Sequence, residues 1–110
     1  MGLTKTENFT AEQNQIASIA KALAHPARIA ILQEIFKAQS CICGDLVSQI
    51  NLAQPTISQH LKELKNAGLI KGNIEGTSVC YCIDDEQWTQ LKNTLNAFLD
   101  RNISVNDDCC

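Results

Sequence analysis

The sequence predicts a mainly α-helical fold with one small β-hairpin, in the order α-α-α-α-β-β-α. Two observations lead to this prediction. Apolar residues recur at helical spacing along most of the 110 residues, and two short extended runs flank a glycine turn at 75–77. The length favours one domain over 1–110, with a folded core over 10–102 and flexible tails over 1–9 and 103–110. Hydrophobic residues make up 45% and charged residues 19%, which excludes a disordered chain.

The first two helices have clear start signals. Thr10 followed by Gln13 is a capping box, so we expect the first helix to run from Thr10 to about Ala24. Its apolar residues recur at helical spacing at Ile16, Ile19, Ala20 and Leu23. We interpret His25 as a helix-start residue, because Pro26 after it suits the first position of a second helix. That helix is heavily apolar, and therefore central, at Ile29, Ile31, Leu32, Ile35 and Phe36.

The middle of the chain predicts two helices separated by a turn. Residues 40–43 are interpreted as a connector or a loose helix start. A short third helix follows at 45–50, and 51–53 is a three-residue turn. Pro55 sets the start of a fourth helix, which Gly68 ends.

A hairpin and a last helix complete the predicted fold. The two strands are expected at 69–74 and 78–83. Asp84 and Asp85 can cap the last helix, because acidic side chains favour a helix N-terminus. The apolar face of this helix consists of Trp88, Leu91, Leu95, Phe98 and Leu99.

The short third helix, the turn and the fourth helix form a helix-turn-helix, a unit that places its second helix in the major groove of DNA. The apolar face of the fourth helix is Ile57, Leu61 and Leu64, and its polar side chains suit base edges and phosphates. The residues expected to contact DNA are Gln54, Thr56, Ser58, Gln59, His60, Lys62, Lys65 and Lys71. His60 is expected at an exposed position, as a DNA-facing or a capping residue. The formal charge of −3 argues against purely electrostatic binding, and a solvated polar helix face is the alternative interpretation.

Several motifs together resemble one known family. The segments 22–28 and 54–61 are similar to the opening signature and the recognition helix of ArsR/SmtB-type winged helix-turn-helix repressors. The helix exit at 67–70 and the strand residues that follow Gly76 match the wing. The resemblance implies a cytoplasmic homodimer that binds double-stranded operator DNA and releases it when a metal or metalloid ion binds. It also implies a dimer interface formed by the first and last helices.

The most informative cysteines are Cys41 and Cys43. In the resembled family this Cys-x-Cys is the sensor, and thiolates select thiophilic ions. We expect As(III) or Sb(III) as the effector, as in the arsenic-sensing type, with Cd, Pb or Zn as alternatives. In a regular helix the two side chains would diverge, so one ion can bind both only if the segment is extended or distorted. The family's third cysteine is replaced here by Leu46, and Cys109 and Cys110 are the leading donors in its place.

The other two cysteines, Cys80 and Cys82, are expected on one face of the second hairpin strand, with Val79, Tyr81 and Ile83 on the other face. We leave open whether this pair binds an ion or consists of plain strand residues.

Three alternatives to ion sensing are weighed. Disulfides between the cysteine pairs would make the same fold a thiol-redox switch. Inert cysteines would leave a constitutive DNA-binding protein. An enzyme is not expected, because the chain has neither a Cys-x-x-Cys motif nor a βαβ pattern. We expect no organic cofactor. The last helix has no histidine for a zinc site, and no apolar run approaches the roughly 18 residues of a membrane span.

Overall fold

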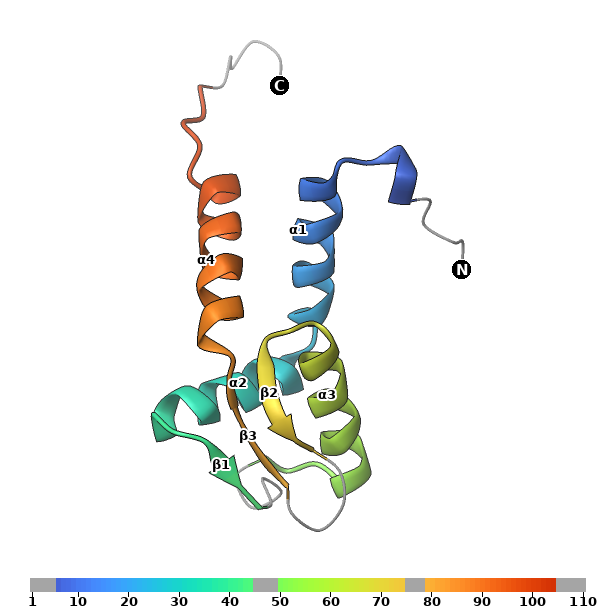
Figure 1. Cartoon of the computed structure of the whole chain (residues 1–110), viewed down its shortest axis with the longest axis vertical. Helices are drawn as coiled ribbons and strands as arrows, with labels where there is room; N and C mark the ends of the chain where they lie inside the picture. Colours follow the sequence, from blue (N-terminus) through green and yellow to red (C-terminus); the bar gives the residue numbers. More distant parts are fainter. Residues whose placement is uncertain (1–5, 45–49, 75–78, 105–110) are drawn as a thin grey trace.

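The computed structural model describes residues 6–44, 50–74 and 79–104 (Figure 1). Its elements in chain order are η1 (Thr6–Asn8), α1 (Ala11–Ala22), α2 (Pro26–Ala38), β1 (Ile42–Cys43), α3 (Gln54–Asn66), β2 (Ile70–Asn73), β3 (Cys80–Ile83) and α4 (Asp85–Leu99). The predicted fold class, mainly α-helical with a small β-hairpin, is confirmed. The short helix expected at 45–50 lies almost entirely outside the described residues.

The helix starts lie where the sequence predicted them. The Thr10 hydroxyl accepts the Gln13 N–H at 3.0 Å, and the Gln13 side-chain oxygen accepts the Thr10 N–H at 3.0 Å. His25 precedes α2, and its Nδ1 accepts the N–H of Ala27 at 3.0 Å. Asp84 precedes α4, and its carboxylate accepts the N–H of Gln87 at 3.2 Å. Each cap satisfies a backbone donor that the first helical turn leaves without a partner.

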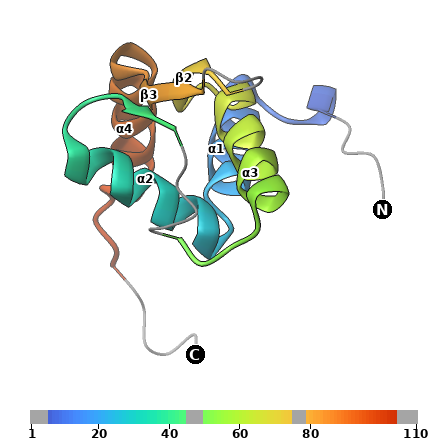
Figure 2. The same ribbon diagram turned by 90° about the horizontal axis from the view of Figure 1, so that it is seen from below.

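Most of the core lies between α2, α3 and the sheet, and Figure 2 shows α2 passing beneath the sheet beside α3. Ile19 and Ala22 of α1 and Leu91 of α4 complete the core. Ile31 of α2 and Leu64 of α3 are completely buried, which confirms that α2 is central and that α3 has an apolar face. The largest fully buried side chains are Tyr81, Ile31, Ile57, Leu64, Leu69 and Ile70. Helices α1 and α4 rise side by side away from this core in Figure 1.

A third strand extends the predicted hairpin. The sheet order is β1-β3-β2 and both pairings are antiparallel. The expectation of a connector or loose helix start at 40–43 is therefore wrong for Ile42 and Cys43. The reason is a contact distant in sequence, because Ile42 pairs with Tyr81 and Cys43 pairs with Cys80. An edge of β3 that the hairpin alone would leave unpaired is thus covered.

The hairpin depends on one glycine. Gly72 has φ 123°, and a Cβ there would meet the carbonyl oxygen of Cys80 and lie 2.9 Å from the Cα of Tyr81. We expect Gly72→Ala to lower the free energy of unfolding by about 2–4 kcal/mol, measured by urea denaturation. Gly68→Ala is the control, because its Cβ would meet only the flexible Gln87 side chain at 3.6 Å, and its φ of 83° should cost about 1 kcal/mol. Equal losses in the two variants would contradict this interpretation.

Among the described residues, no helix combines the length and the apolar character that crossing a membrane requires.

Candidate functional site

Helix α3 presents a polar face away from the core. Ser58 is half-buried, and the exposed residues of α3 among those predicted to contact DNA are Gln54, Thr56, Gln59, Lys62 and Lys65. Lys71 is exposed as well, on β2. The Gln59 side-chain amide donates to the Glu63 carboxylate at 3.1 Å. Lys65 Nζ donates to the carbonyl oxygen of Gly72 at 2.7 Å, so it links α3 to β2. This face has short amide and hydroxyl side chains at its N-terminal half and lysines further along.

His60 is not exposed, and the prediction of an exposed His60 facing DNA is wrong in this respect. Its side chain is only 8% exposed, its Nδ1 accepts Arg28 Nε at 3.2 Å, and its ring lies 4.4 Å from that of His25. Arg28 also donates to the carbonyl oxygens of Lys21 and Ala22. The cluster therefore ties α3 to α2 and to the end of α1. The sequence spacing indicates this burial, because position 60 lies three residues after Ile57, inside the apolar stripe of the helix.

The surroundings of His60 make the stability of the fold depend on pH. Burial, followed by the nearby His25 and Arg28, lowers the pKa of His60 from 6.5, while Glu63 opposes this. The unfolded chain therefore binds the proton more readily, and the free energy of unfolding should fall as the pH drops below 6.5. Urea denaturation above and below that pH should show a smaller loss for His60→Gln, whose amide oxygen can still accept from Arg28. An identical pH dependence in the two proteins would contradict the role given to His60.

Four cysteines meet on one face of the sheet. Cys43 lies opposite Cys80, and the same register places Cys41 opposite Cys82. The Gly44 N–H donates to the carbonyl oxygen of Val79 at 2.8 Å, so Gly44 and Val79 form a hydrogen-bonded pair. The two kinds of pair alternate along an antiparallel ladder, so Cys43–Cys80 and Cys41–Cys82 are both non-hydrogen-bonded pairs. Side chains approach most closely at such pairs. Both cysteine pairs thus occupy the closest positions of the β1–β3 ladder.

The two pairs differ in chemical state. Cys43 and Cys80 form a disulfide, with α-carbons 4.0 Å apart. Cys41 and Cys82 are free thiols; Cys41 is exposed and Cys82 is half-buried. A hydrogen bond with Cys41, followed by burial, raises the pKa of the Cys82 thiol, with Asp85 adding to the effect and Lys71 opposing it. Cys82 is therefore protonated at neutral pH and lacks the lowered pKa of an activated thiolate.

The backbone at Cys41 and Cys43, the cysteines predicted to be the sensor, agrees with part of the sequence prediction. Ile42 and Cys43 are extended, the backbone form that a shared ion at Cys41 and Cys43 requires. Cys109 and Cys110, predicted as further ligands, lie outside the described residues, as does Leu46. Across 6–44, 50–74 and 79–104, no group of three or more His, Cys, Asp or Glu side chains is placed to hold a metal ion.

The sequence left Cys80 and Cys82 open and did not pair them with Cys41 and Cys43. The matching Cys-x-Cys spacing of the two motifs was compatible with such pairing, because each motif puts two thiols on one face of a strand. Nothing local indicates that strands 37 residues apart are neighbours.

A hollow of about 600 Å³ lies beside the free thiols. Cys41 and Cys82 line one side of it, and Phe36 of α2 and Trp88 of α4 form an aromatic wall. The two rings pack edge to face with centroids 5.0 Å apart. Lys71 lines the hollow as well, because it lies opposite Cys82 in the β2–β3 pairing. Lys71, predicted to contact DNA, lies on β2 within the predicted hairpin strand, next to Cys82.

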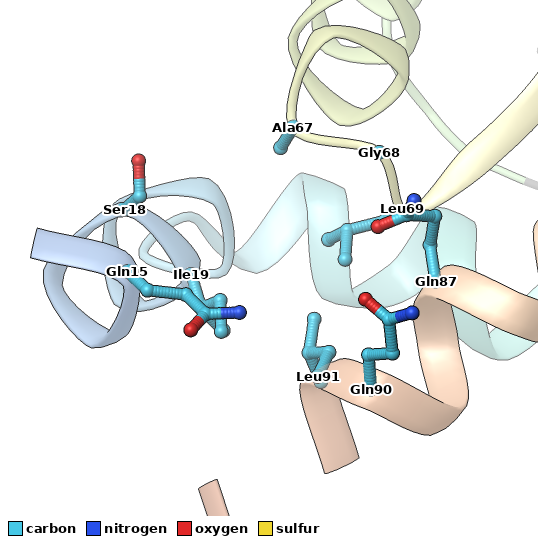
Figure 3. A pocket seen from close by; sticks show the side chains of 9 residues that line it. All are labelled: Gln15, Ser18, Ile19, Ala67, Gly68, Leu69, Gln87, Gln90 and Leu91. Carbon is cyan, nitrogen blue, oxygen red and sulfur yellow. The ribbon is translucent and has the colours of Figure 1, made fainter. Parts of the chain in front are cut away.

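A second, smaller hollow of about 110 Å³ lies where α1, the end of α3 and α4 meet (Figure 3). Ile19, Leu69 and Leu91 point toward one another there, with Gln87 and Gln90 at the side of α4. Its lining contains no titratable or metal-binding side chain. This hollow therefore offers no group for acid-base chemistry or metal binding.

The helices, the hairpin and the polar face of α3 together define a winged helix-turn-helix domain. The model of the family described as "Bacterial regulatory protein, arsR family" matches residues 25–71. This match and the relatives below show that the chain belongs to the arsR family. The resemblance to this family seen in the sequence is confirmed.

Two curated relatives illustrate the membership. The transcriptional repressor SmtB of Mycobacterium tuberculosis is 42% identical over 73 residues, which are 66% of this chain and 53% of that protein. This chain thus spans about half the length of that relative. A homolog of the cadmium resistance regulatory protein CadC from Staphylococcus aureus is 37% identical over 92 residues, which are 81% of this chain and 75% of that protein.

One solved structure supports the fold independently. The homodimeric winged helix-turn-helix DNA-binding domain Mb0332 from Mycobacterium bovis, described as a possible ArsR-family regulator, superimposes with a TM-score of 0.61. It is 27% identical in sequence, and the match covers 94% of each chain.

Proposed function

We propose that this chain is a homodimeric transcriptional repressor that acts in the cytoplasm. It binds operator DNA through α3 and releases the DNA when a thiophilic ligand binds at the cysteine face. The observation that carries the proposal is the position of Cys41, just before β1, and Cys43, within β1. This strand lies before α3 in the chain and is joined to the wing strand β3 by the Cys43–Cys80 disulfide. A ligand there can change the position of the DNA-binding elements.

The surface of α3 supports DNA binding. Gln54, Thr56 and Gln59 are exposed and carry donors and acceptors suited to base edges, and Lys62 and Lys65 suit phosphates. Ser58 is half-buried and can still present its hydroxyl. His60 leaves the proposed set because of its burial, whereas Lys71 is exposed on β2 and stays in it. The relatives named above are called repressors or regulators of transcription.

Exposed apolar residues support dimerisation through α1 and α4. Phe98 and Leu99 at the end of α4 are 44% and 69% exposed, and Ile103 beyond it is 82% exposed. A second copy of the chain would cover these side chains, and the Mb0332 domain is described as homodimeric. Two-fold symmetry would match a pseudo-palindromic operator with half-sites about one DNA turn apart.

The effector we favour is As(III) or Sb(III), bound through Cys41 and Cys43, because clustered thiols without histidine suit a three-coordinate soft centre. Cd, Pb and Zn are the alternatives. The third thiol would come from Cys109 or Cys110, or from Cys80 or Cys82, which lie on the same face as the sensor pair. Binding through Cys43 requires the disulfide with Cys80 to be reduced.

A second candidate effector is the redox state of the thiols. The Cys43–Cys80 disulfide favours it specifically, because that bond links the strand before the helix-turn-helix to the wing. Oxidation and reduction of this one bond would then change operator affinity without any ion.

A gel-shift assay on the DNA upstream of the chain's own gene tests both candidates. The reduced protein is titrated with arsenite, antimonite, Cd, Pb, Zn and peroxide in separate series. Release by arsenite or antimonite supports the favoured effector, and release by peroxide alone supports the redox switch. Binding that no addition changes would contradict both. Absence of any shift, or an affinity that does not depend on salt concentration, would contradict operator binding itself.

A further inference from the structure

We propose that the hollow beside Cys41 and Cys82 binds mono-organic trivalent arsenicals, R–As(OH)2, with the arsenic on the two thiols and the organic group against Phe36 and Trp88. The proposal rests on the proposed function, since it names a ligand class for the same cysteine face. This site differs from the proposed arsenite site in the number of thiols, because it uses two thiols and leaves the Cys43–Cys80 disulfide intact.

The number of thiols points to this ligand class. With Cys43 and Cys80 bonded to each other, Cys41 and Cys82 are the free thiols of this face, and they are in hydrogen-bond contact. Inorganic arsenite needs a third sulfur to complete a soft three-coordinate centre. An arsenical whose third substituent is already carbon needs only two.

The binding reaction is a substitution and needs no oxidant. Two As–O bonds break and two As–S bonds form. The two thiol protons leave with the two hydroxides as two molecules of water. Arsenic stays trivalent, and the Cys43–Cys80 bond is not involved.

The walls of the hollow point to an aromatic or other apolar substituent. Phe36 is 44% exposed although it belongs to the most apolar helix, and its ring contacts Trp88. The volume of about 600 Å³ lies within the range of small-molecule pockets. An organic group placed there would cover apolar surface that water now contacts, and burial of that surface favours binding.

The charges at the hollow are balanced. Lys71 and Asp85 both line it, so one ammonium and one carboxylate lie beside the thiol pair. Their effects on a charged ligand oppose each other, and R–As(OH)2, which carries no charge, needs neither group as a counter-ion. The alternation of the strands places Lys71 on the same face as Cys82.

The test uses phenylarsine oxide and methylarsonous acid as probes. Trp88 is the chain's single tryptophan, so its fluorescence reports binding in the hollow directly. The titration is done on the full-length chain without added thiol, and on its Cys109→Ser/Cys110→Ser variant, because those adjacent thiols could also bind the reagent. We expect one phenylarsenical per subunit, bound about 10-fold or more tightly than the methyl compound.

Substitutions test the thiol pair and the aromatic wall of the hollow separately. Cys41→Ser and Cys82→Ser should each weaken phenylarsenical binding at least about 100-fold, because the second bond is lost. Phe36→Ala should remove most of the preference for phenyl over methyl while binding of the methyl compound persists. Phe9→Ala is the matched control, because Phe9 is 53% exposed and does not line the hollow. Unchanged binding in Cys41→Ser, or unchanged preference in Phe36→Ala, would overturn the proposal.

The assay contains no DNA, so the two proposals can fail separately. Phenylarsenical binding at Cys41 and Cys82 without operator release would leave this inference standing and contradict the proposed function. Operator release by arsenite, with no preference for the phenyl compound, would leave the proposed function standing and overturn this inference.

Discussion

Replacement of Gln59 with alanine is expected to weaken operator binding by about 10- to 100-fold, which is the worth of one good bidentate base contact. Gln59 is exposed on the polar face of α3, and its amide is held by the Glu63 carboxylate at 3.1 Å. The side chain has no part in the core, so the variant should fold as the wild type does. Fluorescence anisotropy with labelled operator measures the affinity. Ser58→Ala should have a smaller effect, because its hydroxyl is half-buried.

Gln33→Ala is the matched control for this prediction. Gln33 is exposed on α2, and the same substitution there should leave operator affinity unchanged. An equal loss in both variants, or no loss in Gln59→Ala, would contradict the assignment of α3 as the recognition helix. Ligand affinity of the DNA-free protein should be the same in all three proteins, because neither glutamine lies at the cysteine face.

Cys41→Ser is expected to abolish operator release by arsenite while leaving operator affinity in its absence unchanged. Serine keeps the size of the side chain and replaces the soft sulfur by a hard oxygen, so a thiophilic ligand loses one of its bonds. The wild type should lose about 5- to 150-fold in operator affinity on binding the effector, and the variant should lose none. Cys43→Ser should behave in the same way, and anisotropy titrations of the operator complex measure both.

A Cys109→Ser/Cys110→Ser variant identifies the third ligand. Normal release by arsenite in this variant would assign the third thiol to Cys80 or Cys82, which share the face of Cys41 and Cys43. Loss of release would assign it to Cys109 or Cys110. Release at wild-type arsenite concentrations in Cys41→Ser itself would contradict the proposed sensor.

Local signals predicted the helices well. The capping box at Thr10 and the His25–Pro26 start involve neighbours in the chain, and the structure has both. The alternation around Tyr81 likewise placed that residue on the face opposite Cys80 and Cys82, and it is only 1% exposed there. Each of these features is determined by interactions within a few residues, so the sequence pattern is sufficient.

Contacts distant in sequence could not be predicted in this way. Strand β1 has only two residues, and it exists because Ile42 and Cys43 pair with β3. The partnership of the two Cys-x-Cys motifs and the position of Lys71 beside Cys82 follow from the same sheet register. The burial of His60 depends on Arg28, 32 residues earlier, which offers its Nδ1 a charged donor.

The net charge of −3 did not predict the candidate DNA surface either. The exposed lysines of α3, Lys62 and Lys65, lie on the proposed recognition face, while Asp84 and Asp85 lie at the start of α4. Asp84 caps that helix through the Gln87 N–H. The distribution of charge over the fold, rather than its sum, is what bears on DNA binding.

Thermodynamic linkage gives the most direct test of the central claim, that a thiophilic ligand at the cysteine face and operator DNA oppose each other's binding. The measurement is the affinity of the reduced wild-type chain for arsenite, free and saturated with operator, beside its operator affinity with and without arsenite. Linkage requires the two ratios to be equal, and we expect both to be about 5-fold or more. Arsenite affinity that is the same for the free and the DNA-bound chain would contradict the claim.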